Sequence, residues 1–161
     1  MKHVTIAIDP GASGGIVIAT PHGAVAHAMP ATDGDLVDLL EAVIVSSRIE
    51  NYPICAVVEL VGGYAGGVGQ PGSAMFNFGR NFGFILGLLA ALHVRVELVR
   101  PQVWQKALGL GNSKSHASKS AWKNHLKARA QQLFPQQKVT LKTADALLIL
   151  EFATKTKTTQ P

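Results

Sequence analysis

Three acidic residues that are far apart along the chain stand where their side chains could act together. Asp9 ends the apolar run VTIAID, and Glu59 ends the apolar run ICAVVE. Asp145 lies near the start of a third apolar segment, TADALLIL. If the first two runs are neighbouring strands, Asp9 and Glu59 meet at their carboxyl ends, and a helix packed beside them brings Asp145 to the same point. The sequence therefore predicts a cluster of three carboxylates.

Such a cluster predicts a hard divalent cation. Three negative side chains at a partly buried site repel one another by several kcal/mol unless a cation lies between them. Oxygen ligands without a cysteine–histidine cluster favour Mg²⁺, with Mn²⁺ as a substitute, over zinc. One ion, or a pair about 3.5–4 Å apart, can activate a water and stabilise the phosphate during phosphodiester cleavage.

Each acid also has a plainer interpretation. Asp9-Pro10-Gly11 is a common turn sequence, and Asp145 suits the positive end of a helix. Glu59 has no comparable role in a turn. Singly these signals are weak; jointly they favour catalysis. Three histidines are possible proton carriers or ordinary surface and strand residues: His3, His116 and His125.

The 161-residue chain has a formal net charge of +5, and its positive charges are concentrated. No acidic residue lies between Glu97 and Asp145. A surface of one sign suits a polyanion such as nucleic acid, whereas a face kept for solubility usually mixes both signs. Lys119, Lys123 and Lys127 recur every four residues and predict a stripe for the phosphate backbone. The predicted DNA-binding residues of this stretch are Lys114, Lys119, Lys123, Lys127 and Arg129.

The apolar pattern predicts one α/β domain over residues 1–153, followed by a polar, disordered tail over residues 154–161. Hydrophobic residues make up 47% of the chain. The predicted strands are residues 3–9, 14–19 and 24–29, which form an antiparallel meander, and residues 54–60 and 94–99. A short extended piece is predicted at 139–141, and the predicted helices are residues 33–49, 75–93, 101–108, 118–134 and 143–153. Trp104 and Trp122 are predicted to pack in the core.

Two features of the middle of the chain suggest contacts with partners. Gly62–Ser73 is rich in glycine and predicts a mobile loop that becomes ordered on a partner. The apolar helix Met75–His93 carries Gly79, Gly83 and Gly87 at four-residue spacing. Such small residues permit close approach of another backbone, or they serve plain core packing.

The sequence predicts a cytoplasmic protein without a membrane partner. No apolar run reaches the roughly 18 residues of a membrane span, and the first residues lack the pattern of a signal peptide. The single cysteine, Cys55, lies in an apolar strand and fits a small buried residue in a reducing compartment.

Four segments together resemble the RuvC-like Holliday junction resolvases of the ribonuclease H-like superfamily, particularly the short forms of phages and prophages. They are IAIDPGASGG, AVVELV, FGRNFGFILGLLAAL followed by VELVRPQVWQKALGL, and KTADALLILEFA, and the resemblance extends from Val4 to Ala153. It implies a five-stranded mixed β-sheet flanked by α-helices, in a bacterial host or a prophage. It also implies two-metal, Mg²⁺-dependent nicking of four-way junctions or other branched DNA. By position, Asp9, Glu59 and Asp145 match the catalytic acids of that family.

The resemblance further implies a homodimer, because a four-way junction is nearly two-fold symmetric and its resolution needs two cuts. The helix Met75–His93 is the candidate dimer face. The glycine-rich loop would meet DNA near the branch point, where Tyr64, Phe76 or Phe78 stacks on an unpaired base, unless these rings belong to the core. Arg80 is a further predicted DNA contact.

The chain departs from the family pattern at Lys142, three residues before Asp145, where the family usually has an aspartate or a histidine. The second metal is then bound weakly, or the Lys142 ammonium takes over part of its role, or activity is reduced or lost. The alternative function is therefore a non-catalytic or weakly active protein that binds branched DNA. The motif DPGASGG also resembles the phosphate loop of actin-like ATPases and sugar kinases, but 161 residues leave no room for their second half.

Overall fold

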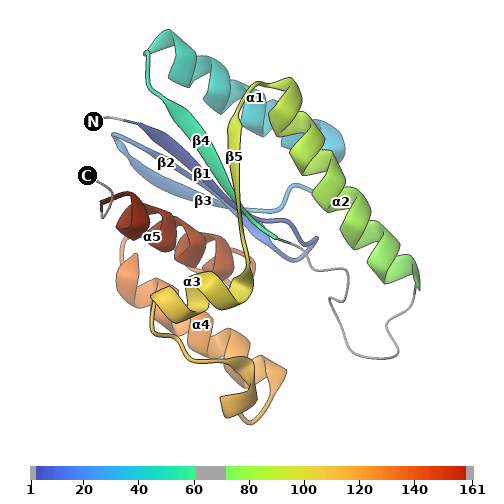
Figure 1. Ribbon diagram of the computed structural model, residues 1–161, viewed down its shortest axis with the longest axis vertical. Helices are drawn as coiled ribbons and strands as arrows, with labels where there is room; N and C mark the ends of the chain where they lie inside the picture. The colour runs from blue at the N-terminus through green and yellow to red at the C-terminus, as the bar shows by residue number, and fades with distance from the viewer. Residues whose placement is uncertain (1–2, 61–71, 159–161) are drawn as a thin grey trace.

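The computed structural model describes residues 3–60 and 72–158, and these form a three-layer α/β domain (Figure 1). Its centre is a five-stranded sheet in the order β3-β2-β1-β4-β5. The first three strands are antiparallel neighbours, whereas β4 runs parallel to both β1 and β5. The mixed five-stranded sheet predicted from the sequence is confirmed. Its strands are β1 (Val4–Asp9), β2 (Gly15–Thr20), β3 (Gly23–Ala28), β4 (Ile54–Glu59) and β5 (Arg95–Val99).

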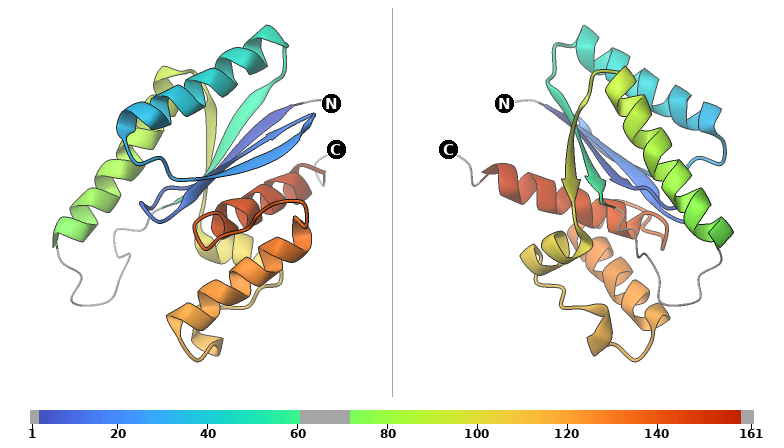
Figure 2. Two further views of the ribbon diagram at one scale, coloured as in Figure 1. Left: turned by 180° about the vertical axis from the view of Figure 1, so that it is seen from behind. Right: turned by 45° about the vertical axis from the view of Figure 1, so that its right-hand side comes forward.

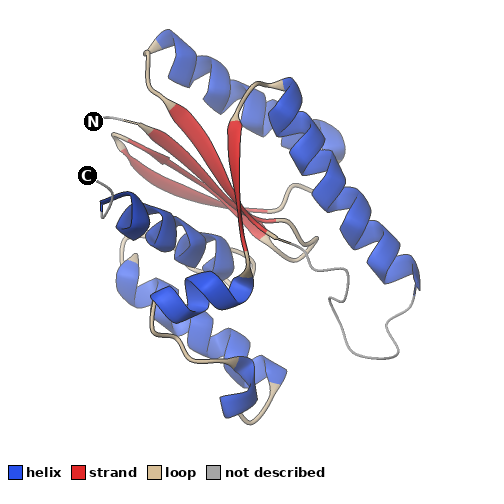
Figure 3. Cartoon of the chain, in the orientation of Figure 1, coloured by secondary structure: helices blue, strands red, loops and turns tan. Residues whose placement is uncertain are grey.

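Helices cover both faces of the sheet. Two helices lie on one face and three on the other, and the sheet separates the two groups (Figures 2 and 3). The first group is α1 (Asp33–Ile49) and α2 (Gly72–Ala91); the second is α3 (Pro101–Ala107), α4 (Lys119–Leu133) and α5 (Ala144–Thr158), with a short 3₁₀ turn at Ser113–Ser115.

The alternation of side chains along the strands explains these layers. Ile6 and Ile8 of β1 face α1 and α2, while Ala7 between them faces the side of α5. Both faces are apolar because helices cover both. The small Ala7 leaves room for α5 to lie close to β1, so residues at the start of α5 come near the end of that strand.

Helix α2 begins earlier than predicted, at Gly72, within the segment predicted as a loop. The rest of that loop, residues 62–71, lies outside the described part of the chain. The predicted extended piece at 139–141 is not part of the sheet: residues 139 and 140 have no regular secondary structure, and residue 141 begins the turn that precedes α5. Helix α5 continues to Thr158 and so covers most of the predicted tail; residues 159–161 lie outside the described part.

The two faces of α2 are both apolar, but only one is covered. Ile85 and Leu89 are buried against the sheet, whereas Phe76 on the other side is 70% exposed. Among the described residues, α2 alone is long and apolar enough, by length and composition, to span a membrane. One such helix is weak evidence of a membrane span, because core helices of soluble proteins and signal sequences have the same length and composition.

Candidate active site at the carboxyl ends of β1 and β4

Strand pairing brings Asp9 and Glu59 together. Strands β1 and β4 are parallel, with Ile8 opposite Val58, and the next residues along are Asp9 and Glu59. Adjacent parallel strands lie about 4.8 Å apart, so both carboxylates leave the sheet at one edge. The charge of Asp9 raises the pKa of Glu59, which agrees with this placement of the two carboxylates.

The glycines after Asp9 allow the chain to fold tightly against this carboxylate. A Cβ atom at Gly14 would lie 2.3 Å from the carbonyl oxygen of Asp9 and 2.7 Å from its Cγ. At Gly15 it would lie 2.6 Å from the carbonyl oxygen of Lys142. Any side chain at either position would force backbone apart. Gly15 thus lets the chain just before α5 approach β2, which brings the start of α5 to the end of β1.

Asp145 reaches the site from the first turn of α5. Thr140 and Thr143 hold this helix start: the Thr143 hydroxyl accepts a hydrogen bond from the Thr140 N–H at 3.0 Å, and the two hydroxyls lie 3.1 Å apart. Asp145 is 6% exposed, and the electrostatic effect of its charge reaches both Asp9 and Glu59. Strand register thus places Asp9 and Glu59 at one edge of the sheet, and Asp145 is near enough for its charge to act on both.

A lysine also enters this cluster. The Lys123 ammonium of α4 lies 2.5 Å from Asp145 Oδ2 and interacts electrostatically with Asp9 and Glu59. The sequence places Lys123 in a stripe for phosphates, so its role beside Asp145 was missed. The burial of Trp122 and Leu126 on the same helix fixes α4 against the core and turns Lys123 toward α5.

Trp104 was predicted as a core residue, and it is: its side chain is 1% exposed. It has a second role, because its indole Nε1–H donates a hydrogen bond to Glu59 Oε2 at 2.8 Å. A buried indole N–H needs an acceptor, and a glutamate that ends the neighbouring strand supplies one. Trp104 thereby fixes the orientation of the Glu59 carboxylate.

Burial and the neighbouring negative charges disfavour ionisation of Asp9 and Glu59. Burial, and then the charge of Asp145, raise the pKa of Asp9 to about 6. Burial, and then the charge of Asp9, raise the pKa of Glu59 to about 8, although the hydrogen bond from Trp104 acts in the opposite direction. Burial acts to lower the pKa of Lys123, but the charge and hydrogen bond of Asp145 outweigh it and raise that pKa. The site is short of positive charge.

The donor set fits a hard cation. Asp145 Oδ1 is buried and has no hydrogen-bond partner, and a carboxylate oxygen is a ligand that Mg²⁺ prefers. Within residues 3–60 and 72–158, however, no three histidine, cysteine or acidic side chains are already arranged around a metal position. Lys123 engages Asp145 and Trp104 engages Glu59, so binding of an ion requires a local rearrangement of side chains.

Lys142 is exposed and does not occupy the place beside Asp145 that Lys123 takes. It lines a neighbouring cavity of about 640 Å³ together with the turn after Asp9, the start of α2 and Lys119. The lysine whose ammonium lies beside Asp145 is Lys123, and not Lys142 as the sequence suggested. The residues that line this cavity are Gly11, Ala12, Ser13, Ala74, Met75, Asn77, Phe78, Lys119 and Lys142.

The other predicted DNA-binding residues are distributed around this cavity and beyond it. Phe78 lines it, whereas the more exposed Phe76 does not. Arg80 pairs with Asp33 of α1, which makes it a link between helices as well as a surface charge. Tyr64 lies outside the described residues. Four further positions are exposed or half-buried: Lys114 is exposed in the 3₁₀ turn, Lys119 is exposed on α4, and Lys127 and Arg129 are half-buried on α4.

The histidines do not join the acids. His116 and His125 pack around Trp122, with ring centroids 4.9 Å and 5.6 Å from the indole and 4.8 Å from each other. His3 precedes β1, at the end of the strand away from Asp9. None of the three histidines is among the groups that perturb Asp9 or Glu59.

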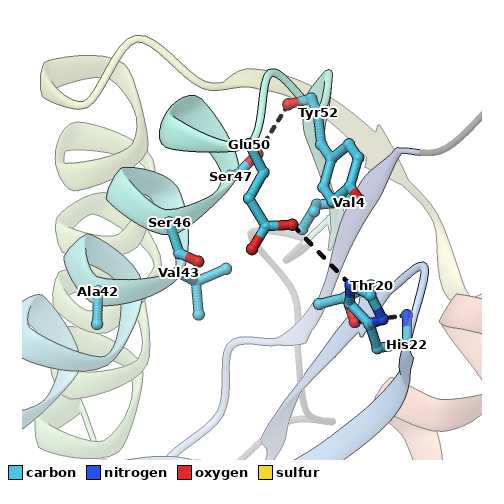
Figure 4. Close-up of a pocket in the computed structure, with 9 residues that line it drawn as sticks. All are labelled: Val4, Thr20, His22, Ala42, Val43, Ser46, Ser47, Glu50 and Tyr52. Atoms are coloured by element: carbon cyan, nitrogen blue, oxygen red, sulfur yellow. Dashed lines mark hydrogen bonds and ion pairs between the residues drawn. The ribbon is translucent and has the colours of Figure 1, made fainter.

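A second cavity, of about 290 Å³, lies at the opposite end of β1 (Figure 4). It is lined by Val4 and by residues of α1 and the β2–β3 turn, and His22 lies 3.9 Å from Glu50 at its edge. It contains none of the clustered acids. Within the described part of the chain, Asp9, Glu59, Asp145 and Lys123 interact at the carboxyl ends of β1 and β4, away from this cavity.

Comparison with known proteins identifies the fold. Neither protein-family models nor curated proteins give a match. Among solved structures, RuvC of Thermus thermophilus matches with a TM-score of 0.53 and 19% identity over 96% of this chain and 97% of that chain. T. thermophilus RuvC in complex with a Holliday junction substrate gives the same TM-score and coverage, with 18% identity. The chain has a RuvC-like fold, with the mixed sheet and flanking helices that its sequence predicts.

Proposed function

We propose that this protein is a metal-dependent, structure-selective endonuclease that nicks Holliday junctions or other branched DNA. The observation that carries the proposal is the convergence of Asp9, Glu59 and Asp145 at one edge of a RuvC-like sheet, with a buried oxygen of Asp145 left without a partner. The similar RuvC structure with a Holliday junction substrate supports the substrate class. The cytoplasm, where DNA and reduced thiols occur together, is the expected location.

In this proposal Asp9, Glu59 and Asp145 hold Mg²⁺, or Mn²⁺ in its place. An ion held there would supply a water of lowered pKa and positive charge to stabilise the phosphate under attack. Trp104 holds Glu59 in orientation, while Gly14 and Gly15 keep the chain packed against Asp9. One phosphodiester bond is hydrolysed, which leaves a nick with a phosphate on one side and a hydroxyl on the other.

A second candidate function is binding of branched DNA without cleavage. Two observations favour it: Lys123 already neutralises Asp145, and Lys142 stands where a fourth ligand is expected. A labelled four-way junction incubated with the protein and Mg²⁺, or with a chelator, separates the two functions. Nicks that need the metal support the nuclease, whereas tight binding without nicks under Mg²⁺ and Mn²⁺ supports the binder.

The cavity beside Asp9 is the proposed path of the DNA backbone. Lys119 and Lys142 reach it from α4 and from the chain before α5, and Phe78 supplies a ring for an unpaired base. Lys114, Lys127, Arg129, Arg80, Phe76 and Tyr64 are proposed as further contacts around it. We assign Lys123 mainly to the acid cluster, since its ammonium is already bound there.

Replacement of Lys119 by Gln should weaken junction binding and flatten its dependence on salt. Each phosphate contact contributes about 0.9 to the slope of log K against log salt, so one lost contact lowers the slope by about that amount. Fluorescence anisotropy at several salt concentrations with a chelator present measures it. Lys155→Gln is the control, because Lys155 pairs with Glu151 at the far end of α5. An unaltered slope in Lys119→Gln would remove this lysine from the interface.

We further propose that two copies associate through the uncovered face of α2. Gly79, Gly83 and Gly87 lie on that face, where an added Cβ would meet nothing within 4 Å. Phe76 continues the same face toward the start of the helix and is 70% exposed. Glycines at four-residue spacing leave a shallow groove in which a second helix can lie close.

Substitution of Gly83 by Glu should convert the dimer to a monomer, because it places a charge in the centre of an apolar contact. Sedimentation equilibrium measures the mass directly. Gly83→Ala is the matched control, since alanine keeps the position small and apolar. A wild-type protein that sediments as a monomer at micromolar concentration would contradict the proposed dimer.

A further inference from the structure

We propose that Lys123 is an internal counter-ion that occupies the place of a divalent metal at Asp145, so that metal binding must displace it. This inference rests on the proposed metal site. It concerns what the chain does when no metal is bound, and how tightly it then binds one. Lys123 thereby sets the metal affinity of the site without being a metal ligand.

The first support is geometric. The Lys123 ammonium lies 2.5 Å from Asp145 Oδ2, and the other oxygen of the same carboxylate, Oδ1, is buried without a hydrogen-bond partner. One lysine therefore satisfies half of a buried carboxylate that two protein donors or one metal ion would satisfy fully. The unsatisfied oxygen makes the lysine-bound state costly and leaves room for a better cation.

The second support is charge. Three carboxylates meet at this point, and Lys123 interacts electrostatically with all three. A divalent ion bound to Asp145 would lie within a few ångströms of this ammonium, where two like charges repel strongly in a partly buried site. Both cations cannot be held at once by Asp145 Oδ2.

The third support is that Lys123 can leave. Its side chain is 39% exposed, whereas the Asp145 side chain is 8% exposed. Helix α4 is fixed by Trp122, which is buried, so the exchange needs only rotation of the long lysine side chain toward solvent. The carboxylate stays in place on α5 while the ammonium moves.

Calorimetric titration of chelator-treated protein with Mn²⁺ tests the proposal. Lys123→Met keeps the length and volume of the side chain and removes the charge, and it should bind Mn²⁺ about tenfold more tightly, which corresponds to about 1.4 kcal/mol. Lys155→Met, at the far end of α5, should bind Mn²⁺ as the wild type does, because Lys155 pairs with Glu151 and not with the clustered acids. Equal or weaker binding by Lys123→Met overturns the counter-ion role and leaves the proposed nuclease intact. Absence of binding by all variants overturns both.

A measurement on the unaltered protein covers the case in which Lys123→Met does not fold. Acetic anhydride acetylates accessible lysines, and mass spectrometry of peptides gives the rate at each site. Mn²⁺ should raise the rate at Lys123 several-fold relative to that at Lys119, because displacement by the metal exposes the amine. A ratio that is the same with and without Mn²⁺ would show that the metal leaves the ion pair unbroken and would overturn the proposal.

Discussion

Asp9→Asn is expected to lower metal-dependent nicking of a four-way junction by about a thousandfold or more, because it removes a charged ligand from the group that positions the reacting phosphate. Asp9 ends β1 in the centre of the sheet, and the turn that follows it is packed against its carboxylate. Asparagine has nearly the same shape, so the fold and the basic cavity should persist. Junction affinity without metal should stay within a few-fold of the wild type.

Cleavage of a labelled junction and its binding in the presence of a chelator are measured on the same preparation. Asp38→Asn is the matched control, because Asp38 is exposed on α1, on the opposite face of the sheet from α5. Loss of nicking in Asp9→Asn alone supports the nuclease. Equal nicking by Asp9→Asn and the wild type would exclude the proposed metal site as the catalytic centre.

The stability of the metal-free protein should fall as the pH rises. Burial and the neighbouring charges raise the pKa of Asp9 to about 6 and that of Glu59 to about 8. Each folded pKa is above its unfolded value, so the protein loses stability when these groups must ionise in the folded state. The stability gained from these raised pKa values is fully present only below the unfolded pKa values, near pH 4. It is lost as the pH rises through about 6 for Asp9 and about 8 for Glu59.

Glu59→Gln should therefore stabilise the metal-free protein at pH 9 while it abolishes nicking. The amide oxygen still accepts the Trp104 hydrogen bond, but the side chain no longer ionises. We expect a gain of a few kcal/mol at pH 9, because one pH unit of displacement is worth about 1.4 kcal/mol, and little change at pH 5. Such a trade between activity and stability is typical of functional residues.

Urea unfolding at pH 5, 7 and 9 in the presence of a chelator gives these free energies. The unfolding curve of wild type and that of Glu59→Gln should coincide near pH 5 and separate as the pH rises. Glu97→Gln serves as control, since Glu97 is exposed on β5. If Glu59→Gln were less stable than the wild type at pH 9, Glu59 would be a structural partner of Trp104 and not a strained acid.

The sequence predicts the sheet well because the sheet depends on local pattern and on simple topology. Short apolar runs that end in Asp9 and Glu59 become parallel neighbours, and parallel strands end at one edge. The glycines after Asp9 indicate a turn, but their close contacts with Asp9 and Lys142 appear only when β2 and α5 are packed.

The features that the sequence does not predict depend on contacts of the helices. Lys123 fits a regular basic stripe, and only the packing of α4 on α5 turns it to Asp145. Trp104 is recognisable as a core residue, yet its hydrogen bond to Glu59 depends on where α3 lies beside β4. The polar composition of residues 154–158 suggests a tail, but hydroxyl bonds such as that of Thr154 to the Leu150 carbonyl accompany a longer helix.

Helix α2 also contacts the loop beside Asp9, because the Asn81 side chain donates a hydrogen bond to the Pro10 carbonyl oxygen. If two copies join through α2, this helix forms the dimer interface and also holds the loop beside Asp9. Dissociation of the dimer would then weaken the hold of α2 on the loop beside Asp9 in both copies. Each protomer would then be most active in the dimer, which suits the proposed nuclease, because it must make paired cuts and avoid single ones.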